Sequence, residues 1–253
     1  MTTSWLKARS DIFLRDLFRD FFTAKLYFDT LAEQYNTTST LPFKMLDGWV
    51  GTEANKGPLW DLKDQSHRLF RKGKQKKTLY EPLLDWTIGS IFHEAMKLKE
   101  DCYQVESYKP LLEIEVKTHV KDKELSRIIS EYFSLIDKAT ANLQTGLESI
   151  SELFDKALIQ LQEIIVFHKN NALLLRLLLD NKKTIEKVFG KGAFVPLFEK
   201  AFPEGLHSAY LKAAGQCIDN GWTNEAEAYL KKALKYDPHN KKALKLLSSL
   251  QTT

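Results

Sequence analysis

The 253-residue chain is poor in glycine, proline and cysteine. It has 11 glycines and 7 prolines, where average usage would give about 18 and about 13. A β-sandwich needs a turn roughly every 8–12 residues, so this scarcity argues against that architecture and favours long helices. The two cysteines, Cys102 and Cys217, lie far apart in the sequence and form neither a CxxC motif nor a disulfide framework. Such cysteine usage is typical of a reducing compartment.

The chain also lacks a long apolar run and a large excess of one charge. Its longest apolar stretch, Ala172–Leu179, is interrupted by Arg176 and is too short to span a bilayer. The first residues show no apolar segment of the kind found in secretory signals. With 37 basic and 33 acidic residues, the net charge of +4 does not by itself indicate nucleic-acid binding. We therefore expect a soluble cytoplasmic protein with no membrane association.

Apolar residues make up 43% of the chain and recur mostly at helical spacing, which predicts an all-α fold. Ser10–Tyr35 and Pro82–Tyr103 each carry a wide apolar face, and Gly57-Pro58 is a typical helix start. Trp49 is expected to anchor a short helix in the core. Leu111–Val120 alternates like a strand but has no evident partner strand, so a short helix or an extended connector is the alternative. We predict an N-terminal helical bundle domain over residues 1–144.

The most regular pattern is an apolar stripe with alternating spacings of four and three residues. It comprises Ile129, Phe133, Ile136, Thr140, Leu143, Leu147, Ile150, Phe154, Ala157, Leu161, Ile164 and His168. Such a stripe predicts a long helix that packs at a shallow angle against its neighbours. Gly146 could kink this helix or divide it into two. Further apolar positions widen the stripe, which favours a bundle over an isolated coiled coil.

Residues 207–240 resemble the 34-residue tetratricopeptide repeat. The resemblance is carried by eight signature positions: Tyr210, Ala213, Ala214, Cys217, Ala226, Leu230, Ala233 and Pro238. Six of them fit the family pattern, whereas Ala213 and Cys217 are smaller than usual. Asn220-Gly221 supplies a tight turn between the two expected helices, and Thr223 or Asn224 can cap the second.

We therefore predict a tetratricopeptide-like helical region over residues 145–253. It would contain one clear repeat at 207–240 and a capping helix at 241–250. A second, degenerate copy is suggested because Ala157–Leu178 can be laid over Ala226–Leu247 at an offset of 69 residues, about two repeat lengths. This overlay lacks the repeat's proline, so simple helical hairpins packed on a bundle remain the alternative.

The resemblance implies a groove lined by the first helix of the repeat. The implied lining residues are Ser208, Leu211, Gly215, Ile218 and Asp219. A subgroup of the family uses Lys and Asn at two of these positions to bind C-terminal carboxylates, but here they are Leu211 and Gly215, so that clamp is absent. The alternative is that these residues merely pack on the preceding helices.

A basic tract follows the second expected N-terminal helix. It comprises Arg68, Arg71, Lys72, Lys74, Lys76 and Lys77, with no acidic residue among them. Such a tract can neutralise phosphates, and Phe70 and Tyr80 could stack on bases. We favour a solvated loop between two helices and keep nucleic-acid binding as an alternative function.

Four residues are candidates for a metal site: Asp64 and His67 on one expected helix, and His93 and Glu94 on another. Residues three apart share a helix face, but the second carboxylate–His pair of a helical di-metal site is missing. His93-Glu94 also lacks the HExxH partner of zinc proteases. We favour ordinary polar contacts and expect no metal and no cofactor.

The chain contains no GxxxxGK[ST], GxGxxG or GxSxG motif, so no catalytic mechanism can be stated and no catalytic residue is assigned. We favour a non-enzymatic adaptor, scaffold or regulatory subunit that binds a peptide or helix of a protein partner. The alternative is an enzyme or ligand-binding protein with a site among Trp60, His67, Trp86 and His93. Association of the chain with copies of itself stays open.

Overall fold

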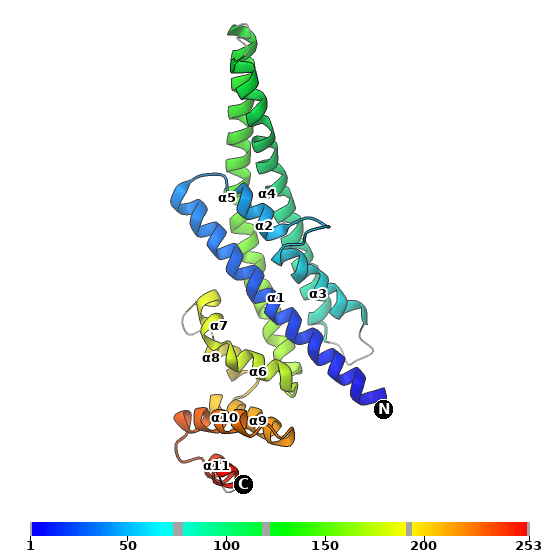
Figure 1. Cartoon of the computed structure of the whole chain (residues 1–253), viewed down its shortest axis with the longest axis vertical. Helices are drawn as coiled ribbons and strands as arrows, with labels where there is room; N and C mark the ends of the chain where they lie inside the picture. Colours follow the sequence, from blue (N-terminus) through cyan, green and yellow to red (C-terminus); the bar gives the residue numbers. More distant parts are fainter. Residues whose placement is uncertain (1, 73–77, 118–121, 191–193, 252–253) are drawn as a thin grey trace. The chain divides into compact units, whose positions relative to one another are not determined.

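The computed structural model describes residues 2–72, 78–117, 122–190 and 194–251. Within them it contains eleven helices (Figure 1): α1 Thr2–Thr38, α2 Phe43–Val50, α3 Pro58–Lys72, α4 Tyr80–Lys117, α5 Asp122–Phe167, α6 Ala172–Asp180, α7 Lys182–Phe189, α8 Phe194–Glu199, α9 Leu206–Asp219, α10 Thr223–Tyr236 and α11 Lys241–Gln251. The described residues form no strand, only an isolated bridge between Gly51 and Lys56. The predicted all-α class is confirmed. None of the described helices is long and apolar enough to cross a bilayer.

The chain divides into two compact units. One comprises Leu17–Leu161, and the other comprises Met1–Asp16 together with Gln162–Thr253. The predicted domain boundary near residue 145 and the observed division both fall inside α5. This helix continues through Gly146 for 46 residues, so it is not divided there.

The core of the Leu17–Leu161 unit is an aromatic cluster between α1, α2 and α5. Phe154 of α5 is fully buried, and its ring centroid lies 5.7 Å from that of Phe21 and 5.4 Å from that of Phe28. Trp49 of α2 lies 6.4 Å from Phe154 and donates its indole N–H to the carbonyl of Ala24 at 2.9 Å. The expectation that Trp49 anchors α2 is confirmed. The indole is completely buried, and its one polar atom has the partner that burial requires.

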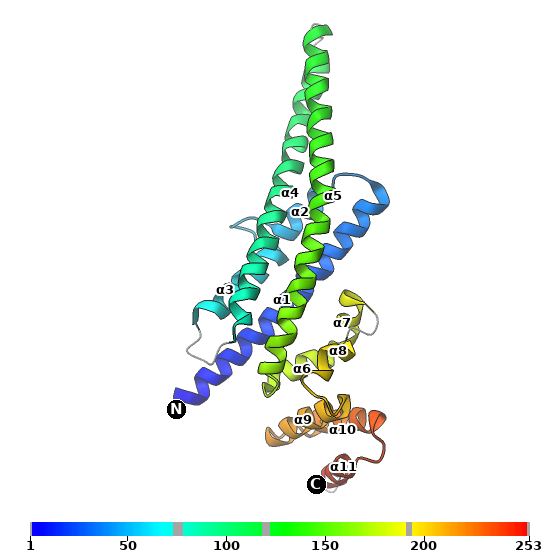
Figure 2. The same cartoon turned by 180° about the vertical axis from the view of Figure 1, so that it is seen from behind.

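In the same unit, α4 and α5 run side by side as an antiparallel hairpin (Figures 1 and 2). Their contacts fix the direction: Tyr108 stacks on Tyr132, Asp101 accepts from Asn142 at 2.8 Å, and Lys156 lies over Trp86. Residue numbers thus fall along α4 as they rise along α5. Gly146 lies opposite Leu98, and a methyl group added to it would be 2.7 Å from Leu98 Cδ2. The glycine therefore serves close packing of the two helices rather than a kink.

The ambiguous segment after Lys109 continues α4 as a helix to Lys117, whereas residues 118–120 lie outside the described residues. The strand alternative for this segment is therefore wrong as far as Lys117. No strand in the described part of the chain could pair with it, so a helix is what satisfies its backbone hydrogen bonds. The helix even passes through Pro110. Leu111 and Ile114 remain more than half exposed, so the alternation there does not mark a buried face.

The end of the second unit contains an antiparallel pair of helices, α9 and α10, followed by α11. Seven of the eight signature positions are buried, and Ala213, Ala214, Ala226 and Ala233 have no exposed surface. Gly221 makes the turn with φ of 74°, which confirms that part of the expected Asn220-Gly221 turn. The predicted cap was wrong: Trp222 is the N-cap residue of α10, and no side chain there bonds the helix. Thr223 is already inside the helix, beyond the cap position.

The connection between two helices recurs at the offset of 69 residues noted in the sequence. Asn171 accepts a hydrogen bond from the amide of Leu174 at 2.9 Å, and Asn240 accepts one from Ala243 at 3.0 Å. Three backbone bonds also correspond, including His168 to Ile164 and Asp237 to Ala233. The predicted cap at Asn171 is confirmed. The ends of α5 and α10 and the starts of α6 and α11 are likewise 69 residues apart.

Two glycines of the α4–α5 hairpin offer a matched test of its packing. A methyl group at Gly89 meets no atom within 4 Å, so Gly89→Ala should stabilise the protein by about 0.5–1 kcal/mol through helix propensity. Gly146→Ala gains the same propensity but pushes against buried Leu98, and overpacking typically costs about 1–3 kcal/mol. We expect it to lower the free energy of unfolding by about 1 kcal/mol. Urea unfolding monitored by circular dichroism measures both, and equal stabilisation by the two would contradict the close packing.

Candidate functional site

The four residues proposed as an N-terminal ligand site do not come together. Trp60 of α3 packs edge-on against Phe92, with ring centroids 5.1 Å apart. His67 of α3 lies with Nδ1 3.4 Å from Asp85 Oδ2, and His93 is exposed on α4. Trp86 is 67% exposed and contacts Lys156 of α5 instead. Trp60 and Trp86 thus contact different neighbouring helices and do not line one pocket.

The metal-site candidates are each engaged in an ordinary ion pair or lie exposed. Asp64 pairs with Lys56, His67 approaches Asp85, and Glu94 pairs with Lys97 at 3.0 Å. Across the part of the chain that the structure describes, no group of three or more His, Cys, Asp and Glu residues gathers to hold a metal ion. The contact expected between Asp64 and His67 is replaced by separate partners from other segments.

Neither cysteine is an activated nucleophile. Cys102 is 1% exposed, and burial raises the pKa of its thiol to about 12, with the charges of Asp101 and Glu106 adding to the shift. Burial also raises the pKa of the Cys217 thiol, although the guanidinium of Arg176 opposes this. A thiol must ionise to react or to bind a metal, so both remain inert packing residues near neutral pH.

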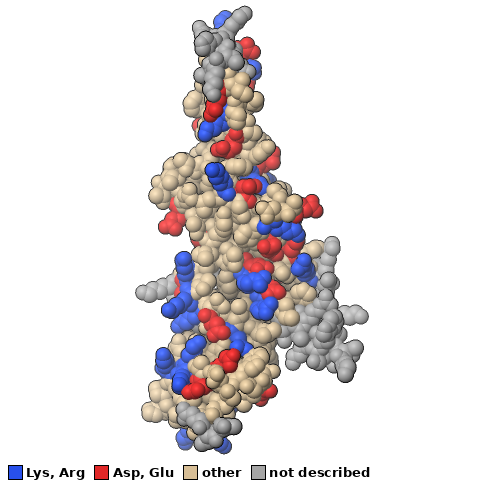
Figure 3. All heavy atoms as spheres, in the orientation of Figure 1, with Lys and Arg blue, Asp and Glu red and all other residues tan. Residues whose placement is uncertain are grey.

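Only part of the basic tract can be placed. Arg68 is exposed on α3, and the backbone of Arg71 and Lys72 forms the end of the same helix. Lys74, Lys76 and Lys77 lie outside the described residues. On the face seen in Figure 3, basic and acidic side chains lie interspersed.

The implied groove residues lie along α9 and are mostly half-buried. Ser208 donates to Glu204 at 2.8 Å, and a methyl group added at Gly215 would meet open space. Leu211 is the sixth residue of α9, as Leu177 is of α6 and Leu246 of α11. All three leucines are half-buried, and the starts of these helices are 34 and 35 residues apart. The α9 face therefore combines side chains that pack with surface that stays open.

A second surface was missed from the sequence. Leu79, Leu83, Trp86 and Ile159, which we name the Trp86 patch, are 73%, 37%, 67% and 60% exposed. The patch is continuous because α4 and α5 are antiparallel: Lys156 contacts Trp86, and Ile159 is one turn after Lys156 where Leu83 is one turn before Trp86. Helical spacing in Pro82–Tyr103 correctly marked Leu84, Ile88 and Ile91 as core, but it did not show that Leu83 and Trp86 face outward.

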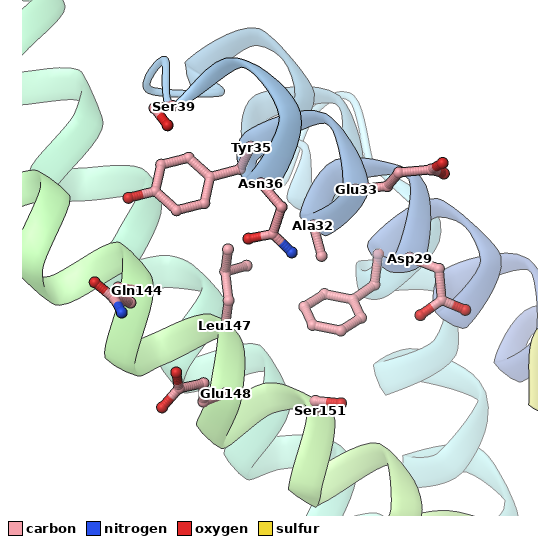
Figure 4. Close-up of a pocket in the computed structure, with 11 residues that line it drawn as sticks. Asp29, Ala32, Glu33, Tyr35, Asn36, Ser39, Gln144, Leu147, Glu148 and Ser151 are labelled. Carbon is pink, nitrogen blue, oxygen red and sulfur yellow. The ribbon is translucent and has the colours of Figure 1, made fainter.

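A third feature, which we name the α1–α5 cleft, has a volume of about 590 Å³. It is lined by Phe28, Asp29, Ala32, Glu33, Tyr35, Asn36 and Ser39, and across from them by Gln144, Leu147, Glu148 and Ser151. Figure 4 shows Tyr35 and Leu147 between the two helices. Buried apolar surface thus forms its floor, while three carboxylates and several amide and hydroxyl groups lie at its walls.

The carboxylate of Asp29 is the most perturbed acidic group of the cleft. Burial raises its pKa above the ordinary value, and the nearby charge of Asp155 acts in the same direction. Lys25 opposes this shift, since its Nζ lies 2.5 Å from Asp29 Oδ1. The cleft therefore holds partly desolvated negative charge, which a further cation would stabilise.

Comparison of the chain with protein-family models, with curated proteins and with solved structures gives no match. The function therefore has to be inferred from the surfaces of the molecule itself.

Lys25→Met should raise the pKa of Asp29 further, because it removes the cation that favours the ionised carboxylate. Since the folded-state pKa lies above the unfolded value of 3.8, Asp29 lowers stability as pH rises through its folded pKa. The variant should lose more stability over this window than the wild type. Titration of the Asp29 carboxyl carbon by NMR checks the shift, and an unchanged or lower pKa would show that Lys25 is not its counter-ion.

Proposed function

We propose that the chain is a helical scaffold that binds other proteins, and that the Trp86 patch is its main contact surface. The observation that carries this proposal is the exposure of four large apolar side chains in one continuous area of the α4–α5 hairpin. Single exposed apolar residues are normal, but clusters of them on a soluble surface mark binding sites.

The chemistry of the patch favours a protein surface as its ligand. Tryptophan is enriched among residues that dominate binding energies, because its large ring is buried at little cost in conformational entropy. Lys156 lies 5.5 Å from the Trp86 ring centroid, so a cation sits beside the apolar area. An apolar centre with a charged rim is the usual anatomy of an interface between proteins.

The C-terminal unit supports the same function. The resemblance to the tetratricopeptide repeat predicts stacked helical hairpins that present a peptide-binding groove. Helices α6, α9 and α11 start at the spacing of such repeats, and each carries a half-buried leucine at its sixth position. We propose that Leu211 and its neighbours on α9 bind a peptide or helix of a partner by apolar contact.

Trp86→Ala should abolish capture of the main partner while changing the free energy of unfolding by less than about 1 kcal/mol, since the ring is mostly exposed. Pull-down with the full chain, quantified by mass spectrometry, measures the loss. Tyr103→Ala, at a residue 54% exposed on the same helix, is the matched control. Leu211→Glu tests the α9 face separately. If neither Trp86→Ala nor Leu211→Glu changed the captured proteins, the scaffold function would be refuted.

A further inference from the structure

We propose that the α1–α5 cleft and the apolar stripe of α5 beyond it form one groove that binds a basic amphipathic helix of a partner protein. This inference rests on the proposed function, since it names a second docking surface and the chemistry of its occupant. It is independent of the Trp86 patch, because it uses different residues of the same unit.

The first step is that the stripe of α5 is covered along only part of its length. Its members from Leu143 to Leu161 are at most 7% exposed, and Phe154 among them packs against α1. Farther toward the start of α5 the same spacing continues through Thr140 and Ile136 to Phe133. Phe133 is 58% exposed, and Ile136 and Thr140 are only half-buried. The apolar pattern therefore extends beyond the surface that this chain covers.

The second step is that the cleft lies where the covering helix ends. Helix α1 crosses α5 obliquely (Figures 1 and 2) and stops at Thr38, close in sequence to the cleft residues Tyr35 and Ser39. On α5 the cleft is lined from Gln144 to Ser151, directly after Thr140 in the stripe. Residues 133, 136, 140 and 147 share one face at helical spacing. The cleft and the uncovered stripe are therefore continuous along α5.

The third step concerns the shape of the occupant. The covered part of the stripe already receives a helix, α1, whose aromatic side chains pack against Phe154. A second helix can use the same ridges and grooves of α5 farther along, because the spacing of the stripe does not change. An occupant of about four to five turns would span from the cleft to Phe133, at 1.5 Å per residue.

The fourth step concerns the charge of the occupant. Asp29, Glu33 and Glu148 line the cleft, whereas no Lys or Arg is among its lining residues. Glu33 and Glu148 are exposed and can pair with cations without a large desolvation cost. Asp29 already has Lys25 as a partner and adds to the negative potential. The matching helix carries Lys or Arg at the end that enters the cleft and apolar residues along one face.

The test uses a fluorescein-labelled synthetic peptide of 18 residues, with leucines at alternating spacings of three and four and lysines beside them. A matched peptide has glutamate in place of every lysine. Fluorescence anisotropy with the full chain should show at least tenfold tighter binding of the lysine peptide, weakened by added salt. Equal binding of the two peptides would overturn the proposal.

Variants of the full chain locate the site. The double variant Glu33→Lys and Glu148→Lys should weaken binding of the lysine peptide at least tenfold, and Phe133→Ser at least fivefold. Glu152→Lys is the control, because this exposed residue of α5 does not line the cleft. Circular dichroism confirms that each variant is folded. If the cleft variants had no larger effect than Glu152→Lys, the groove would not be the binding site.

Two further outcomes separate this inference from the proposed function. Loss of the pulled-down partner in Trp86→Ala together with unchanged peptide binding leaves both standing as independent surfaces. Peptide binding that depends on the cleft would support the groove even if Trp86→Ala captured the same proteins as the wild type. Light scattering covers another occupant: if the chain were a dimer that Phe133→Ser made monomeric, a second copy would fill the groove and the proposal would be wrong.

Discussion

The packing of Phe154 against the aromatic face of α1 is the contact on which the Leu17–Leu161 unit depends. Phe21, Phe28 and Trp49 surround this one ring, and burying a side chain of that size contributes about 1.5–3 kcal/mol each. The cluster joins α1, α2 and α5, which are far apart in the sequence. It also fixes where α1 crosses α5, and therefore which part of the stripe is covered and which part is left open.

The open surfaces follow from a mismatch in length. Helices α4 and α5 are 38 and 46 residues long, whereas α2 and α3, which contact α4, have only 8 and 15 residues. A hairpin longer than its cover must present apolar side chains to solvent or to a partner, because its spacing is set for burial. The Trp86 patch and the α1–α5 cleft with the uncovered stripe are the two places where this unit does so. In the other unit, the recurring connection around Asn171 and Asn240 builds similar helix–turn–helix elements whose half-buried leucines give a third such surface.

Much of the fold could be predicted from the sequence because its signals are local. Pro58 and Asn171 mark helix starts, and the stripe on α5 marks one long helix. The sites were harder, because spacing shows which residues share a helix face but not whether another helix covers that face. Leu83 and Leu84 look alike in the sequence, yet they are 37% and 1% exposed. The cleft brings Glu33 and Glu148 to one place through the crossing of α1 and α5, which no local pattern encodes.

Hydrogen exchange measured by NMR along α5 tests most directly whether cover by α1 ends within the stripe. Amides buried beneath the aromatic cluster, in residues 143–161, should exchange only through unfolding of the whole unit. Amides in residues 123–138 should exchange through local opening at a much lower free energy, because α1 does not pack on them. Protection that stayed uniform along the whole helix would contradict the account, since it would mean that the distal stripe is as stably held as the core.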